Sequence, residues 1–405
     1  MKLLHTSDWH IGKRLHQIDL MEDQTAFFLW LINLVKKETI DAVLISGDIF
    51  DVANPSSESR KLYYEVLVQL SRLHCKVIIT GGNHDSPAVL EAPKEVLKAI
   101  DIHVVGSNPE NLRDLLIEIP DTEGKPAVVI AAIPFLRDRD LRRMMENESY
   151  EDRLEAVRNG IIKTYHDAAD VCMNEYPGIP AIAMGHLYLM NAKISDSERE
   201  VQIGNLAGID GNMLSDYFGY IALGHLHKPQ EMDNSGRIKY SGTPYPLSFS
   251  EKDNKNRLVL IRLENGEFKS QSIEVPANRK LIKYSGTLEE VKSMLSSFES
   301  NSATFTTLIE LDVIEENFDP GLVSELELIP DTFKGTNALI VKNRIQFKNK
   351  VSGTNELYSI DKNIEDLAPK DVFMKRIESE SLSDESKILL MEAFEEIYEL
   401  IHEQE

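Results

Sequence analysis

The sequence has little cysteine and no long apolar run. Its 405 residues include only Cys75 and Cys172, which provide neither a disulfide framework nor a thiolate metal site. No stretch approaches the roughly 18 continuous apolar residues of a membrane span, and residues 1–10 lack the apolar core of a signal peptide. We therefore expect a soluble protein of the reducing cytoplasm that does not enter a membrane.

The sequence is also poor in positive charge. It has 44 Lys and Arg residues against 67 Asp and Glu residues, a formal net charge of −23. Because contacts to a nucleic-acid backbone come from Lys and Arg, this balance argues against a free-standing nucleic-acid binder. It does not exclude DNA as a substrate, since metal ions or a basic partner can neutralise phosphates locally.

What the sequence does contain is a regular alternation of predicted strands and helices. Apolar runs predict strands at residues 2–6, 41–46, 76–79, 127–133, 181–184, 220–223 and 238–240. Helical spacing of apolar residues predicts helices at 21–38, 60–73 and 150–172. The alternation implies a layered α/β fold with parallel strands and right-handed crossovers. In such sheets, ligands bind beyond the carboxyl ends of the strands.

The motif with the most candidate functional side chains is Gly81-Gly82-Asn83-His84-Asp85, which follows the predicted strand at 76–79. Its two glycines allow a tight turn, so Asn83 and His84 lie at the carboxyl end of that strand. A carboxamide, an imidazole and a carboxylate on one strand-to-helix turn suit metal and phosphate chemistry. Asn, His and Asp also occur in ordinary turns, so this motif is informative only together with others.

Four further motifs place similar side chains after predicted strands. They are Asp8-x-His10, Gly47-Asp48, Gly185-His186 and Gly224-His225-x-His227. Residues two apart in extended chain point to the same side, so Asp8 and His10 share one wall of a site. The same spacing places His225 and His227 on one side.

Together the motifs supply seven candidate metal ligands, which are Asp8, His10, Asp48, Asn83, His186, His225 and His227. This mixture of carboxylates, imidazoles and a carboxamide suits Mn²⁺, Fe²⁺ or Zn²⁺ better than Ca²⁺. Seven ligands fit two ions if one carboxylate bridges them, and Asp48 on a central strand is the best candidate. Two ions about 3.5–4 Å apart can clamp a phosphoryl group and supply a hydroxide for in-line attack.

His84 has a different predicted role, because its neighbour Asn83 is already a candidate ligand. It can stabilise the transition state or protonate the leaving oxygen, and Asp85 can orient its ring. A single histidine after a strand is usually a hydrogen-bonded turn residue, but five of them in four motifs favour a metal site. Asp51 can support the site from behind the ligands, but we favour its interpretation as a turn carboxylate, and we expect Trp9 to pack beneath the site.

A change in composition after residue 251 predicts a second, smaller α/β domain. Its predicted strands and helices are at residues 279–284, 288–298, 306–313, 319–326 and 338–345. We expect a core domain at residues 1–255, a small domain at 275–347 and an acidic helical region at 348–405.

The acidic region ends in a predicted helix with an apolar stripe. From residue 371 to residue 405 the chain has 11 acidic and 3 basic residues. Leu390, Phe394, Ile397 and Ile401 fall on one helical face. This face either packs on its own domain or docks a partner, and the pattern alone leaves both open.

The five motifs resemble those of the calcineurin-like metallophosphoesterases, and the resemblance extends from Asp8 to His227. Within that superfamily, residues 5–12, 47–51 and 240–249 are similar to the SbcD family of bacterial nuclease subunits. Val52-Ala53 stands where the protein-phosphatase branch has an arginine and a glycine, which argues against that branch.

This resemblance implies an Mn²⁺-dependent DNA nuclease of repair, recombination and replication. It implies a 3′→5′ exonuclease on duplex DNA and an endonuclease on hairpins or single strands. It also implies a homodimer bound to two copies of the ATPase SbcC, and a capping domain that matches the small domain. The chain has no Gly-x-x-x-x-Gly-Lys-[Ser/Thr] motif, so any ATP dependence must come from SbcC, for which the acidic end helix is a candidate dock.

The resemblance further implies how the site residues divide between two ions. One ion is held by Asp8, His10, Asp48 and His227, and the other by Asp48, Asn83, His186 and His225, with His84 as the catalytic histidine. Two alternatives stay open from the residues alone. One is a metallophosphoesterase acting on a small phosphodiester, a phosphomonoester or a phosphoprotein, and the other is a non-enzymatic scaffold, which the complete ligand set disfavours.

Overall fold

The computed structural model describes residues 1–141, 150–193, 208–298 and 304–349, together with Phe373, Leu390 and Phe394. The chain divides into two compact units. The first consists of Met1–Tyr284, Ser297–Leu311 and Phe333–Lys342, and the second of Ser285–Ser296, Asp312–Thr332 and Asn343–Glu405. Apart from a few residues, the predicted acidic helical region at 348–405 lies outside the described part of the chain.

The first unit contains two six-stranded sheets. In the first sheet the strands lie in the order β14-β13-β1-β4-β5-β6. Their bounds are β1 Lys2–Thr6, β4 Ala42–Ser46, β5 Lys76–Thr80, β6 Ile102–Val105, β13 Arg257–Glu264 and β14 Glu267–Glu274. β1, β4, β5 and β6 are parallel, whereas β13 pairs antiparallel with both β1 and β14. The first sheet therefore continues past the boundary expected at residue 255.

In the second sheet the strands lie in the order β11-β12-β10-β9-β8-β7. Their bounds are β7 Leu116–Pro120, β8 Pro126–Ala132, β9 Ala181–His186, β10 Tyr220–Gly224, β11 Gln230–Glu231 and β12 Ile238–Tyr240. The four central strands are parallel, as predicted, and the edge strands β7 and β11 are antiparallel to their neighbours.

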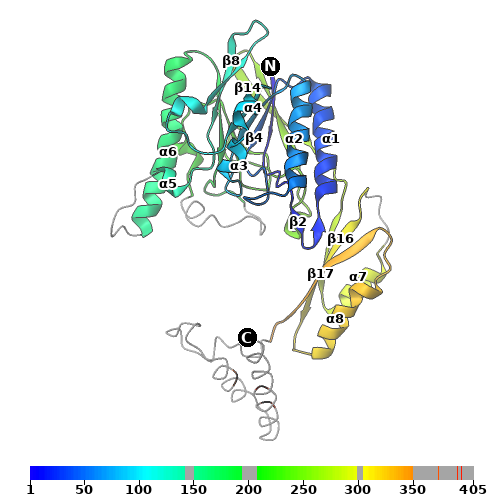
Figure 1. Ribbon diagram of the computed structural model, residues 1–405. Coiled ribbons are helices and arrows are strands. Elements are labelled where there is room, and N and C mark those ends of the chain that lie inside the picture. Colours follow the sequence, from blue (N-terminus) through cyan, green and yellow to red (C-terminus); the bar gives the residue numbers. More distant parts are fainter. Residues whose placement is uncertain are drawn as a thin grey trace, which may run out of the picture. The chain divides into compact units, whose positions relative to one another are not determined.

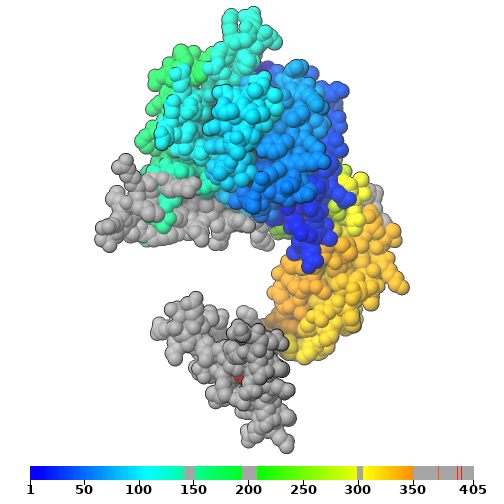
Figure 2. All heavy atoms as spheres, viewed as in Figure 1, coloured from blue at the N-terminus to red at the C-terminus, as the bar shows by residue number. Residues whose placement is uncertain are grey.

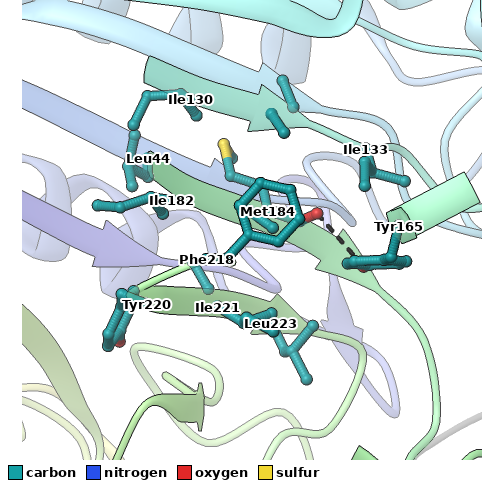
Figure 3. Packing of buried hydrophobic residues seen from close by; sticks show 14 of the residues in the cluster. Leu44, Ile130, Ile133, Tyr165, Ile182, Met184, Phe218, Tyr220, Ile221 and Leu223 are labelled. Atoms are coloured by element: carbon teal, nitrogen blue, oxygen red, sulfur yellow. Dashed lines mark hydrogen bonds between the residues drawn. The ribbon is translucent and has the colours of Figure 1, made fainter. Parts of the chain in front are cut away.

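Alternate residues of the first sheet enter different parts of the core. Leu44 of β4 packs in one cluster with Ile182 and Leu223 of the second sheet (Figure 3). Its neighbours Val43 and Ile45 belong to the other cluster, under the helices. This is the two-residue period of a strand that is buried on both faces.

Three long helices cover the outer faces of the two sheets (Figure 1). They are α1 Met21–Glu38, α2 Ser57–Arg72 and α6 Tyr150–Glu175. Phe28 and Leu67 place α1 and α2 in the cluster on the first sheet, and Tyr165 places α6 in the cluster on the second. The order of layers is helix, sheet, sheet, helix. Figure 2 shows the dark blue to light blue atoms of α1 and α2 forming one continuous surface.

Short elements complete the first unit. They are β2 Arg14–Leu15, β3 Ile18–Asp19, α3 Pro87–Glu91, α4 Lys94–Lys98, η1 Leu112–Leu115, α5 Asp138–Leu141, η2 Gly211–Met213 and η3 Phe249–Glu251. Among the described residues, no helix combines the length and the apolar character needed to cross a bilayer.

A third sheet has the order β15-β16-β17. Its strands and the accompanying helices are β15 Leu281–Gly286, α7 Leu288–Ser296, β16 Thr307–Glu315, α8 Pro320–Thr332 and β17 Ala338–Phe347. Within the second unit, Asp312 accepts two hydrogen bonds from Arg344, at 2.6 and 2.8 Å. These elements occur where the sequence predicts them, and the division into core, cap and tail stays a prediction.

The two-sheet core makes a prediction for a matched pair of leucines. Leu44 is fully buried between the sheets, whereas Leu29 on α1 is 55% exposed. Leu44→Ala is expected to lower the free energy of unfolding by about 2–5 kcal/mol, because it leaves a cavity. Leu29→Ala is expected to change it by less than about 0.5 kcal/mol.

Guanidinium unfolding followed by tryptophan fluorescence measures both variants, since Trp9 and Trp30 lie in the first unit. Similar losses in the two variants would contradict the packing of β4 between two layers.

Candidate metal centre

The predicted site residues lie at the carboxyl ends of central parallel strands. Asp8 and His10 follow β1, Asp48 follows β4, Asn83 and His84 follow β5, His186 ends β9, and His225 and His227 follow β10. The first three strands belong to one sheet and the last two to the other. The site is therefore built where the ends of two facing sheets meet.

Ligand atoms from distant parts of the chain converge there. Those of Asp8, His10 and His227 lie within 4.8 Å of one another, and so do those of Asp8, Asp48 and His186. All five side chains are buried, with at most 4% of each residue exposed. A third group of the same kind joins His84 to His10 and Asp48.

Asn83 and His225 join this cluster through His186. Nδ1 of His186 donates to the carbonyl oxygen of Ser46 at 3.0 Å, so in the neutral ring Nε2 carries a lone pair. That Nε2 lies 2.9 Å from Asn83 Oδ1 and 3.3 Å from Asp48 Oδ2. Asn83 Oδ1 is also 3.2 Å from Nδ1 of His225. His186 Nε2, Asn83 Oδ1 and Asp48 Oδ2 are thus three acceptor atoms that face one another, and they need a positive charge between them.

The pKa values of His186 and Asp48 also indicate that a positive charge is needed between these acceptors. Burial is the largest single influence and lowers the pKa of His186, but the carboxylates of Asp48 and Asp8 and the hydrogen bond to Ser46 together raise it to about 9. Conversely, burial raises the pKa of Asp48, but His186 and His10 bring it well below its usual value. In the ion-free protein a proton on His186 thus supplies the charge that a metal ion would supply.

His10 and Asp8 fit a metal in a second way. Neither ring nitrogen of His10 makes a hydrogen bond to any described residue, although the ring is buried. Burial lowers the pKa of His10 to about 4, so the ring is neutral and its lone pair is available. Burial raises the pKa of Asp8 to about 7, and a neighbouring cation would favour its ionised form.

Four of the seven candidate ligands hold a left-handed backbone conformation that non-glycine residues rarely adopt. The φ angles are 53° at Asp8, 43° at His10, 50° at Asp48 and 101° at His225. Each such conformation costs on the order of 1–3 kcal/mol. Hydrogen bonds from Asp8 N to Gly47 O (3.1 Å) and from His10 N to Asp48 O (3.0 Å) hold two of them. Strain of this kind concentrated on one cluster is typical of functional sites.

Gly82 is required for a close approach to Asp48. A Cβ atom at Gly82 would lie 2.1 Å from Asp48 Oδ1 and 2.3 Å from the Asp48 backbone nitrogen. The same Oδ1 accepts a hydrogen bond from His84 N at 2.9 Å. The motif therefore needs glycine before Asn83 because the first sheet brings its loop directly against the central carboxylate.

The structure corrects the expected role of Asp85. Its carboxylate accepts hydrogen bonds from the backbone nitrogens of Ile49, Phe50 and Gly82, at 3.1, 3.0 and 2.9 Å. It therefore fastens two motif loops together and does not orient His84. This bonding is invisible in sequence because it joins two separate strand ends.

Asp51 contacts the site, which was the alternative to the favoured interpretation as an ordinary turn carboxylate. Its carbonyl oxygen accepts from Nδ1 of His84 at 2.7 Å. Its carboxylate lies 3.3 Å from Nδ1 of His10 and 3.1 Å from the ammonium of Lys13. Trp9, in contrast, packs beneath the site against Phe28, as predicted.

Sequence reasoning missed Glu251, a buried carboxylate 2.9 Å from Nδ1 of His227. The only available signal was its place just beyond the segment 240–249 that carries the family resemblance.

Comparison of the chain with known proteins identifies its family. The family model for the calcineurin-like phosphoesterases matches residues 1–229. A curated relative, the SbcD component of the SbcCD nuclease of Rhodobacter capsulatus, is 35% identical over 277 residues, which cover 66% of this chain and 67% of that protein. The chain belongs to the SbcD family of calcineurin-like phosphoesterases.

Two more distant members of the SbcD family are similar over most of the chain. The SbcD protein of Escherichia coli K12 is 27% identical over 97% of both chains. That of Bacillus subtilis is 28% identical over 75% of this chain and 77% of its own. The predicted family is confirmed, and with it a metal-dependent nuclease function in preference to action on a small phosphate ester.

The contact between Gly82 and Asp48 makes a prediction about metal binding. Gly82→Ala is expected to push the Asp48 carboxylate aside and to weaken Mn²⁺ binding by about 10-fold or more. Gly321→Ala is the control, because the nearest atom to its added Cβ is a carboxylate oxygen of exposed Asp319. Isothermal titration calorimetry on both metal-free proteins measures the affinities. Equal Mn²⁺ affinity in both variants would contradict a central role for Asp48.

Proposed function

We propose that the chain is the nuclease subunit of an SbcCD-type complex and hydrolyses DNA phosphodiester bonds with two divalent metal ions. The observation that carries the proposal is the convergence of five strand ends on one buried cluster of acids and imidazoles. Membership of the SbcD family supports DNA as the substrate, since the relatives are named as subunits of a nuclease.

We propose that Asp8, His10, Asp48 and His227 hold one ion and that Asp48, Asn83, His186 and His225 hold the other. Carboxylate, carboxamide and imidazole ligands without thiolate suit Mn²⁺, which is the ion we propose. Bound divalent ions would supply positive charge to the phosphate and acidify the attacking water. The buried nitrogens of His10, which make no hydrogen bond to described residues, and the acceptors around His186 support this arrangement.

We propose His84 as the catalytic residue. Its Nδ1 donates to the Asp51 carbonyl, which fixes the ring and leaves Nε2 as the atom that gains or loses a proton. Protonated Nε2 can donate to a phosphate oxygen or to the leaving oxygen of the cut strand. His84 is only half-buried, unlike the proposed ligands His10 and His186, as a residue that meets the substrate must be.

The proposed partner is an SbcC-type ATPase, and the proposed assembly is a homodimer with two copies of it. The net charge of −23 supports the division of labour, because the chain has little positive charge with which to grip DNA alone. We further propose 3′→5′ exonuclease action on duplex ends and endonuclease action on hairpins. The free cysteines Cys75 and Cys172 support a place in the reducing cytoplasm.

A matched pair of histidine variants tests the catalytic assignment. His84→Ala is expected to slow Mn²⁺-dependent degradation of linear duplex DNA by about 10²–10⁴-fold, while both ions stay bound. His166→Ala, on the exposed face of α6, is expected to leave the rate unchanged. DNA labelled at either end reports the direction of degradation, and metal analysis reports the ions retained.

Digestion by His84→Ala at the wild-type rate would show that His84 is not catalytic. Rapid hydrolysis of a phosphomonoester by the wild-type protein, with DNA left intact, would replace DNA by a small phosphate ester as the substrate.

A further inference from the structure

Glu251 is a buried carboxylate that none of the strand-end motifs explains. It ends η3 and has no exposed surface. Its Oε1 lies 2.9 Å from Nδ1 of His227. Because a carboxylate only accepts hydrogen bonds, the proton of this contact belongs to Nδ1 of His227. A carboxylate removed from water is costly unless its oxygens are bonded, so its place beside a predicted metal ligand calls for a physical reason.

The surrounding chain holds Glu251 in this position. Its other oxygen, Oε2, accepts from the backbone nitrogen of Leu247 at 2.8 Å, and Oε1 also accepts from the hydroxyl of Ser248 at 3.3 Å. The same segment is fastened to the ligand loop, since Thr243 N donates to His227 O at 3.1 Å. The carboxylate and the imidazole therefore share one rigid backbone frame.

We propose that Glu251 is a positioning residue for His227, an inference that rests on the proposed function. By accepting from Nδ1, it fixes the tautomer in which Nε2 carries the lone pair. It thereby directs Nε2 toward the ion held with Asp8 and His10, whose ligand atoms lie within 4.8 Å of that of His227. A carboxylate behind a ligating imidazole fixes its orientation and raises its basicity.

The selectivity of the effect distinguishes this role from a structural one. Glu251 contacts His227, which we assign to one ion, whereas Asn83 and His225, assigned to the other, lie beside His186. Loss of the Glu251 carboxylate should therefore weaken one metal site and spare the other. A general loss of folding would weaken both.

Calorimetric titration of the full-length, metal-free protein with Mn²⁺ is the first test. Wild type is expected to bind two ions, and Glu251→Gln is expected to bind one of them about 10–100-fold more weakly and the other normally. Glu310→Gln is the matched control. Glu310 is also buried, but it lies in β16 and pairs with Lys283 and Lys342, at 3.5 and 3.7 Å.

A second test uses NMR to determine the tautomer of His227 in the metal-free protein. In protein labelled with ¹⁵N-histidine, the resonance lost in His227→Asn identifies His227. Wild type is expected to show a protonated Nδ1 and an unprotonated Nε2. Glu251→Gln is expected to show both tautomers of His227, with the other histidines unchanged.

The outcomes separate the two proposals. A wild-type protein that binds no Mn²⁺ would overturn the proposed function. A wild-type protein that binds two ions, with Glu251→Gln binding both as tightly, would overturn the role of Glu251 alone. Should Glu251→Gln not fold, Glu251→Asp withdraws the carboxylate by one methylene, and the same selective weakening is expected. Unchanged affinity in Glu251→Asp would then overturn the role.

Discussion

The site depends on one electrostatic constraint, which is that buried acceptors must share a positive charge. Asp48 lies at its centre, because its carboxylate is within 3.3 Å of His186 and 3.6 Å of His10. The protein removes these groups from water and leaves both nitrogens of His10 without a hydrogen bond to described residues. Such an arrangement is stable only when a proton or a metal ion occupies the space between the acceptors.

The two-sheet architecture is what makes this convergence possible. Parallel strands end on the same edge of a sheet, and two facing sheets bring two such edges together. The left-handed backbone at Asp8, His10 and Asp48 then turns the side chains inward directly after the strands. Asp85 fastens the loop that follows β5 to the loop that follows β4 by accepting two backbone hydrogen bonds from the latter, and it accepts a third from Gly82 in its own loop. Stability and function are thus coupled at one edge of the core.

The motifs were readable from the sequence because each is local. A glycine, a short apolar run and a polar or ionisable side chain lie within a few residues of one another, so the turn after β5 and the candidate ligand Asn83 could be predicted together. Contacts between distant segments could not. Asp85 bonds to the loop after β4, and Glu251 reaches His227 across 24 residues, so neither role has a local signal.

The same limit applies to the fold. The parallel strands were predicted from continuous apolar runs, whereas β13 and β14 form a hairpin whose outer strand is mostly exposed and polar. Only the antiparallel pairing of β13 with β1 shows that this hairpin belongs to the first sheet.

The central claim is that two cations bind in one site and share Asp48 as a ligand. Anomalous diffraction from crystals grown with Mn²⁺ tests it most directly. We predict two manganese peaks, both at coordination distance from Asp48, one beside Asp8 and His227 and the other beside Asn83 and His225. A single peak, or peaks away from Asp48, would contradict the claim.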